Sequence, residues 1–227
     1  TLPMMVGSFL QQCYNIADTL IVGQCIGAGA LAAVGSAYTL MVFLISVLLG
    51  LAMGSGTVFS LHYGAGNHVA LRRSIFSSFV LIGIVTLILN VAVFIWLDPI
   101  LRLLQVPQDI YGMMRSYSWI IFCGIVFTFI YNFYASLLRA VGDSVTPLWF
   151  LAVSVVLNIA LDLFFILQLD WGIQGAAAAT VLAQGVAALG IIIYTYRRRP
   201  ELRWHHEDMC FDRTCLKEIA SFSTLTC

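Results

Sequence analysis

The chain has 227 residues, of which 61% are hydrophobic and 10% are charged, and its formal net charge at pH 7 is zero. Soluble globular domains carry about 25% charged residues, so this composition, with a mean hydropathy of +0.96, is typical of a membrane-embedded protein. The zero net charge argues against nucleic acid as a partner. We therefore expect an all-α fold, a polytopic bundle of transmembrane helices surrounded by lipid bilayer.

Segments long enough to cross a bilayer as helices, about 20 apolar residues each, follow one another along the chain. No charged residue occurs between Thr19 and Leu61, which leaves room for the end of a first span, a turn at "GQCIGAG" (23–29) and a second span. A polar loop, "DPILRLLQVPQD" (98–109), follows the third span. The third, fourth, fifth and sixth spans are predicted at 74–97, at 116–138, from Pro147 to about Leu169, and at 173–196, respectively.

The chain begins at Thr1 and stops at Cys227 inside an apolar stretch, so we expect a fragment of a longer protein. If Thr1 lies on the cytoplasmic side, nine of the eleven Lys and Arg residues fall in inside loops, and only Arg102 and Arg115 fall outside. Such a bias sets the orientation of membrane proteins. We therefore predict a multi-pass protein of the plasma (inner) membrane with a cytoplasmic N-terminus.

Two acidic residues stand apart from the other nine, which fall in predicted loops: Asp18 and Asp162 lie within predicted spans. An Asp at the centre of a membrane helix costs about 2.5–3.5 kcal/mol on insertion scales, so it usually faces a cavity or the bundle interior. Asp18 lies fifteen residues after Pro3, and Asp162 fifteen after Pro147. Both carboxylates are therefore expected about 22 Å beyond their prolines, at one depth.

Asparagines accompany both acids. Asn158 precedes Asp162 by four residues and Asn15 precedes Asp18 by three, so each is expected on the face of its carboxylate. Thr180 lies at a similar depth on the sixth span, where its hydroxyl would either join this polar group or bond back to its own helix. If the first and fifth helices are neighbours, these side chains form one polar pocket.

Such a pocket could exchange a cation. Desolvation and a second carboxylate both favour the neutral form of an Asp, so one of the pair could hold a proton and release it when water enters. Two acids and amide oxygens could equally bind sodium, a hard cation that prefers oxygen ligands. The alternative is a hydrogen bond between packed helices, which would not require an ionisable group.

Four stretches resemble the multidrug and toxic compound extrusion (MATE) transporters: "LPMMVGSFLQQCYNIADTLIVGQCIGAGALAAVGSA" (2–37), "HYGAGNHVALRRS" (62–74), "YNFYASLLRAVGDSVTP" (131–147) and "LNIALDLFFIL" (157–167). Members of that family have twelve transmembrane helices in two six-helix lobes. The resemblance implies that 1–196 form the N-terminal six-helix lobe, that 197–218 form a cytoplasmic inter-lobe linker, and that 219–227 begin a truncated seventh helix.

The resemblance also implies a function and its residues. It implies a secondary antiporter that exports drugs or other amphipathic, often cationic compounds by alternating access, coupled to proton or sodium influx. The C-terminal lobe, missing here, would complete it. The ion-coupling residues it implies are Asp18, Asn158, Asp162 and Thr180. The cavity candidates are Pro3, where a kink is proposed in the family, Gln12, Asn15, and Tyr117, which could instead be an interfacial aromatic.

Other functions are less well supported. A lipid-linked oligosaccharide flippase of the same superfamily would carry Arg or Lys inside its spans to meet a pyrophosphate. An intramembrane aspartyl protease would show Tyr-Asp and Gly-x-Gly-Asp patterns, whereas Ala17 precedes Asp18 and Leu161 precedes Asp162. A structural scaffold would not require ionisable groups. We therefore expect no enzyme and no cofactor other than the transported H⁺ or Na⁺.

The segment "HHEDMCFDRTC" (205–215) contains two histidines and two cysteines at loosely metal-like spacing. It matches no zinc pattern and lies in the predicted linker. We interpret it as a solvated connector and predict no metal site.

Overall fold

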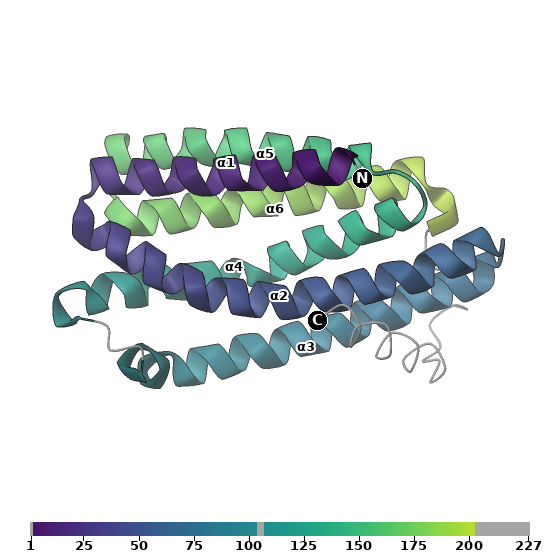
Figure 1. The fold of residues 1–227 in the computed structure, drawn as a ribbon, viewed down its shortest axis with the longest axis horizontal. Coiled ribbons are helices and arrows are strands. Elements are labelled where there is room, and N and C mark those ends of the chain that lie inside the picture. Colours follow the sequence, from purple (N-terminus) through teal and green to yellow (C-terminus); the bar gives the residue numbers. More distant parts are fainter. Residues whose placement is uncertain (1, 104–106, 203–227) are drawn as a thin grey trace.

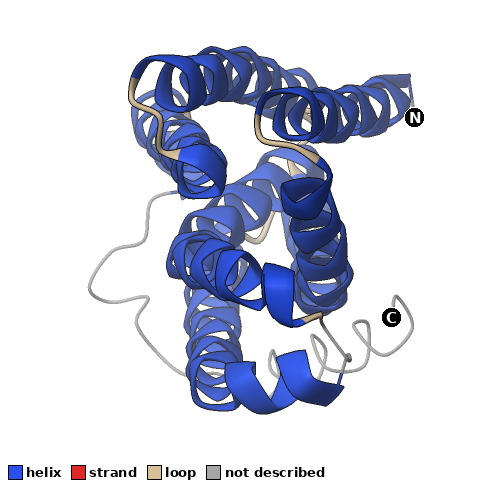
Figure 2. Cartoon of the chain, turned by 90° about the vertical axis from the view of Figure 1, so that its left-hand side faces the viewer, coloured by secondary structure: helices blue, strands red, loops and turns tan. Residues whose placement is uncertain are grey.

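The computed structural model describes residues 2–103 and 107–202. This part of the chain is an all-α bundle of long helices joined by short loops (Figure 1, Figure 2). The α-helices are α1 (Leu2–Cys25), α2 (Ala28–Gly64), α3 (His68–Leu103), α4 (Gln108–Ala140), α5 (Val145–Leu163) and α6 (Gly172–Arg198). A π-helix, η1 (Phe164–Gln168), extends α5, and a 3₁₀ turn, η2 (Pro200–Leu202), follows α6.

The predicted turns and spans agree with this order. The turn at 23–29 separates α1 from α2, and Pro147 lies in the first turn of α5, where its missing N–H costs no intrahelical hydrogen bond. Helix α6 ends at Arg198, so the predicted lobe boundary at residue 196 falls within its last turn. The rest of the predicted linker and the seventh span (203–227) lie outside the described residues.

The predicted polar loop at 98–109 is wrong. Helix α3 continues through Pro99 to Leu103, and α4 already begins at Gln108. The apolar periodicity explains the extension, because Leu97 and Leu101 are both buried one turn apart. Asp98, predicted in a loop, is therefore helical, and it accepts hydrogen bonds from Tyr111 Oη (2.8 Å) and Arg115 Nε (2.9 Å) of α4.

Five helical segments of the described chain are long and apolar enough to cross a membrane: 28–64, 68–103, 108–140, 145–168 and 172–198. Helix α1, predicted as the first span, is not among them. It is 24 residues long, but it carries Gln11, Gln12, Asn15 and Asp18. The described chain is thus a multi-pass membrane bundle in which α1 lacks a stretch as apolar as those of the other five segments.

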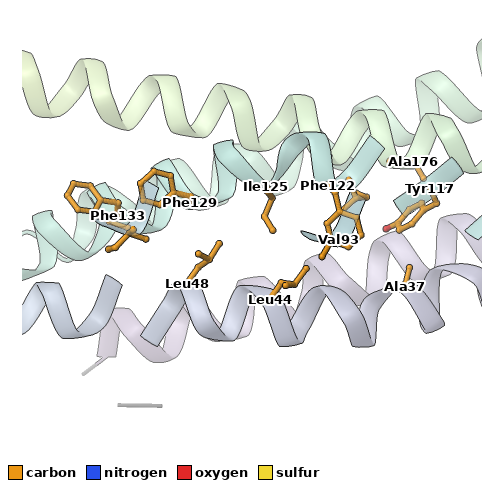
Figure 3. Close-up of a cluster of buried hydrophobic side chains, with 14 of the residues drawn as sticks. Ala37, Leu44, Leu48, Val93, Tyr117, Phe122, Ile125, Phe129, Phe133 and Ala176 are labelled. Atoms are coloured by element: carbon orange, nitrogen blue, oxygen red, sulfur yellow. The ribbon is translucent and has the colours of Figure 1, made fainter. Parts of the chain in front are cut away.

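Helix α4 lies at the centre of the hydrophobic core. Its buried side chains meet residues of α2, α3 and α6, as the close-up of this cluster shows (Figure 3). The aromatic rings of Phe129 and Phe133 also contact Phe79 of α3, with centroid distances of 5.4 and 5.2 Å. On the other side of the bundle, α1 lies beside α5, and both run in the same direction (Figure 1).

Glycine allows α4 and α6 to approach closely. A Cβ atom at Gly124 of α4 would collide with Val181 of α6, and the side chain of Val181 is β-branched and stiff. Small residues at such crossings let membrane helices pack backbone to backbone. This contact holds the backbones of α4 and α6 close together at Gly124.

We predict that Gly124→Ala lowers the stability of the purified full-length protein by about 1–3 kcal/mol, because overpacking forces the backbones apart. Thermal unfolding in detergent measures the change. Gly112→Ala, on the same helix with open space around its Cβ, is the matched control and should be neutral. Combining Gly124→Ala with Val181→Ala should restore stability; a double variant as unstable as Gly124→Ala would contradict the packing argument.

Candidate functional site

The two intramembrane carboxyl groups meet between α1 and α5. Asp18 and Asp162 lie close enough for their carboxyl groups to interact, and the exposed fractions of the two residues are 8% and 0%. Two buried carboxylates at this proximity repel each other, so the arrangement favours a proton on one of the two groups, or another cation between them. The predicted convergence of Asp18 and Asp162 is confirmed.

A chain of hydrogen bonds links this pair to α6. In the orientation that satisfies both ends of its amide, Asn158 donates from Nδ2 to Asp162 Oδ2 (3.1 Å). Its Oδ1 accepts from Thr180 N (3.2 Å) and Thr180 Oγ1 (3.3 Å). Tyr14 Oη lies 3.1 Å from Thr180 Oγ1, completing a path from α1 through α6 and α5 back to the carboxyl pair.

Each member reaches the site by helical spacing. Asn158 and Asp162 are one turn apart on the buried face of α5, and Tyr14 precedes Asp18 by one turn on α1. Thr180 stands on the small-residue face of α6, where Ala176, Ala177 and Ala179 are buried. Because these alanines occupy little volume, α5 and α6 can pack closely enough for Asn158 to reach the Thr180 hydroxyl.

Two oxygen atoms of the pair have no hydrogen-bond partner among the described residues: Asp18 Oδ1 and Asp162 Oδ1. A buried acceptor without a partner costs about 1–3 kcal/mol, more when it is charged. The site therefore offers two unsatisfied carboxyl oxygens, while the Asn158 amide oxygen is taken up by Thr180. Such a set of hard oxygen donors fits a proton or a small alkali cation.

Tyr117 of α4 is also part of this environment. Its side chain is buried, and it lies near enough to Asp18, Asp162 and Tyr14 to interact with them electrostatically. The alternative interpretation of Tyr117 as an interfacial aromatic is therefore wrong for this structure. Thr180, for which a bond back to its own helix was the alternative, instead bonds to Tyr14 and Asn158.

Asn15 does not join the carboxyl pair. Its Nδ2 donates to Gln12 Oε1 (3.3 Å) and to Tyr38 Oη of α2 (3.4 Å), on a more exposed side of α1. A spacing of three residues leaves a side chain about 60° from the reference residue, and here that turn carries Asn15 towards α2. Gln12 lies on this second face as well. The Pro3 side chain lies outside the described residues.

Sequence reasoning did not find Tyr14. The signal was present, because Tyr14 lies four residues before Asp18, the spacing that identified Asn158 before Asp162. An aromatic residue in an apolar helix usually belongs to the hydrophobic core, however, so the neighbouring Asn15 was predicted as the partner of Asp18 instead.

A small cavity adjoins the site on the side of α2 and α4. Most of its walls are apolar, and Thr128, Thr180 and Gln184 supply polar groups. Thr180 therefore belongs to both the cavity and the carboxyl site. The residues lining the cavity are Met41, Ile45, Ile121, Gly124, Ile125, Thr128, Thr180, Val181 and Gln184.

No cluster of three or more His, Cys, Asp or Glu side chains with the geometry of a metal site occurs within 2–103 and 107–202. The weakly metal-like residues His205, His206, Cys210 and Cys215 lie outside the described residues. Their interpretation as a solvated connector stays a prediction.

The hydrogen-bond chain predicts a specific coupling. Thr180→Val should destabilise the full-length protein by about 1–3 kcal/mol, because Tyr14 and Asn158 lose their shared partner. A double-mutant cycle with Tyr14→Phe should give a coupling free energy above about 0.5 kcal/mol in denaturant or thermal unfolding. The control is Thr195→Val on the same helix, whose buried hydroxyl donates to Ile191 O within its own helix (2.8 Å). Additive effects of Thr180→Val and Tyr14→Phe would contradict the chain.

Comparison with known proteins agrees with the resemblance. The chain is 36% identical over 199 residues to "Probable multidrug resistance protein YpnP" of Bacillus subtilis strain 168, covering 88% of this chain and 45% of that protein. It is 29% identical over 198 residues to "Multidrug export protein MepA" of Staphylococcus aureus strain NCTC 8325, covering 86% and 43%. The chain thus spans about half the length of the curated relatives it matches.

Solved structures show the same relation. A crystal structure of a MATE protein in the bent conformation superimposes with a TM-score of 0.93 at 26% identity, covering 100% of this chain and 50% of that one. An outward-facing multidrug resistance MATE family transporter matches with a TM-score of 0.90 at 26% identity, over 98% and 50%. The sequence model of the MatE family matches residues 3–164. The chain therefore belongs to the MatE family and corresponds to its N-terminal lobe.

Proposed function

We propose that the longer protein to which this chain belongs is a secondary antiporter that exports amphipathic, often cationic compounds against an inward flow of protons or sodium ions. The observation that carries this proposal is the Asp18–Asp162 contact in the bundle interior. Burying a charged Asp in a membrane helix is unfavourable. A hydrogen bond that only packs two helices together could be made by neutral side chains such as Asn or Ser. A pair of ionisable groups is required only if the site changes its charge.

The chemistry of coupling follows from the geometry. When the pair is closed off from water, one proton or one small cation held between Asp18 and Asp162 removes most of the cost of burying two negative charges. When water reaches the pair, both carboxylates are solvated and the cation can leave. The site thus favours a closed arrangement when occupied and an open one when empty, which is the differential interaction that a conformational change requires.

The cavity beside Thr180 supports a link between the ion and the exported compound. Its mostly apolar walls with a few polar groups suit an amphipathic ligand. Thr180 lines the cavity, and its hydroxyl bonds to Tyr14 and Asn158 of the carboxyl network, so a change at the carboxyl pair also acts on a residue in the wall that the ligand meets. Inward flow of cations can offset the cost of moving a cationic compound outward, about 2.3 kcal/mol per charge per 100 mV.

Two other functions fit less well. The residues lining the cavity include no charged side chain, so it offers no cation to a pyrophosphate-linked lipid, as a flippase would need. The carboxyl pair is tied into a network with Tyr14, Asn158 and Thr180, and Asp162 is fully buried, which leaves no room for a peptide bond between the acids. The names of the relatives, which refer to multidrug export or resistance, also favour the antiporter.

The other half of the protein and the orientation in the membrane belong to the same proposal. The chain spans half of the related structures, so a C-terminal lobe would complete the transport path. The excess of Lys and Arg on one side supports a cytoplasmic N-terminus and a cytoplasmic linker in an inner membrane.

We predict that Asp18→Asn and Asp162→Asn each lower gradient-driven efflux by the full-length protein at least about tenfold, because either change removes the shared cation-binding group. Efflux of a fluorescent organic cation from reconstituted vesicles, with proton and sodium gradients imposed separately, measures the effect and identifies the ion.

Asp109→Asn is the matched control, because Asp109 is an exposed carboxylate in the first turn of α4. It should transport like the wild type. Efflux that persists undiminished in Asp18→Asn or Asp162→Asn, in a correctly inserted protein, would rule out that residue as part of the coupling site.

A further inference from the structure

A second polar network lies at the end of the bundle where α4 turns into α5. Gly142, with φ of 89°, shapes this turn, and Asp143 follows it. Asp143 Oδ1 accepts from Thr146 N (3.0 Å), and Asp143 Oδ2 accepts from Thr146 Oγ1 (2.8 Å). Both bonds are charge-assisted and satisfy a donor in the first turn of α5, so Asp143 fixes where this helix begins.

The same carboxylate reaches the end of α6. Tyr194 Oη donates to Asp143 Oδ2 (3.3 Å), and Arg199 Nη2 lies 4.0 Å from that atom. Arg199 also lies 3.5 Å from Glu201 through Nη1. The Asp143 side chain is only 13% exposed, so its charge is less screened than that of a surface pair. Asp143 therefore joins the start of α5 to the end of α6.

The α5–α6 pair is tied at two further levels. At the opposite end, the Phe165 ring stacks on Trp171 with a centroid distance of 5.2 Å. Between the ends, Asn158 bonds to Thr180. Near Asp143 the two helices also touch through the rings of Phe150 and Tyr194, 6.2 Å apart. At this end of α5, Tyr131 Oη of α4 donates to Pro147 O (2.9 Å) and ties α5 to α4, whereas Asp143 supplies the polar link to α6.

We propose that Asp143 is a positioning residue that clamps the cytoplasmic ends of α5 and α6, so that the helix pair carrying Asn158, Asp162 and Thr180 moves as one rigid body during transport. This inference rests on the proposed transport function. If α5 shifted relative to α6 at one end, side chains along both helices would be displaced. By preventing this shift, the clamp preserves the Asn158–Thr180 contact while the surroundings of α5 and α6 change.

The test uses the full-length protein in vesicles. Asp143→Asn keeps an oxygen for Thr146 N but loses the charge that attracts Arg199, and Arg199→Gln removes the other partner. Asp143→Asn weakens the charge-assisted bonds from Thr146 and Tyr194, and Arg199→Gln removes the cation 4.0 Å from Asp143 Oδ2. Each should therefore lower the maximal efflux rate about tenfold with little change in KM. The double variant should be no slower than either single variant, since both break one unit. Asp109→Asn, an exposed carboxylate outside the network, should have no effect.

A cross-link separates clamping from general damage. Cys residues are introduced as Phe150→Cys and Gly190→Cys, in a background without native cysteines, because a Cβ at Gly190 would contact the Phe150 ring. Joining them with a short flexible thiol reagent should leave wild-type efflux intact and restore efflux to Asp143→Asn. The rate of cross-linking should fall several-fold in Asp143→Asn, since the helix ends separate.

The clamp is overturned by any of three results: wild-type efflux and cross-linking in Asp143→Asn, loss of efflux when the otherwise wild-type pair is cross-linked, or no restoration of Asp143→Asn by the link. If the wild-type protein shows no gradient-driven efflux at all, the transport proposal fails instead. The cross-linking rate, which needs no transport, then decides whether Asp143 holds α5 to α6.

Discussion

The constraint on which the structure depends is the burial of two acidic side chains from different helices at one point. Asp18 on α1 and Asp162 on α5 cannot both be charged in contact with each other without a cation between them, because repulsion and desolvation act together. Each helix therefore depends on the other, and both depend on what occupies the pair. The polar chain through Asn158, Thr180 and Tyr14 extends this dependence to α6.

The rest of the bundle provides a rigid frame for this variable site. Helix α4 packs its aromatic residues against α2 and α3 and meets α6 at a glycine, so one side of the site is held by dense apolar contacts. Helix α1 bears half of the carboxyl pair and, unlike the other long helices of the described chain, has no stretch apolar enough to identify it as a membrane span. A change in the charge of the pair thus acts directly on α1, which packs mainly against α5.

Sequence alone located most of the site because charge is so unfavourable in an apolar span that Asp18 and Asp162 could not be overlooked. Helical spacing then placed Asn158 correctly, but it failed for Asn15, since three residues leave a side chain between two faces and only the position of α2 decides which face it joins. Tyr14 was missed because it carries no charge that would mark it as unusual in an apolar helix.

The predicted end of the third helix at Asp98 and Pro99 was too early, because local propensity was weighted above the continuing apolar face of Leu97 and Leu101. The α5–α6 clamp could not be predicted, since Asp143 looks like an ordinary loop acid until α6 is placed beside it.

The central claim is that Asp18 and Asp162 hold one exchangeable cation jointly. The most direct measurement is the uptake or release of protons by the purified full-length protein in weakly buffered detergent solution, during a pH step and on addition of sodium. The account predicts a single exchange event that disappears completely in Asp18→Asn and equally in Asp162→Asn. An event that survives in either variant, or that is halved in each, would show that the two acids bind cations separately or not at all.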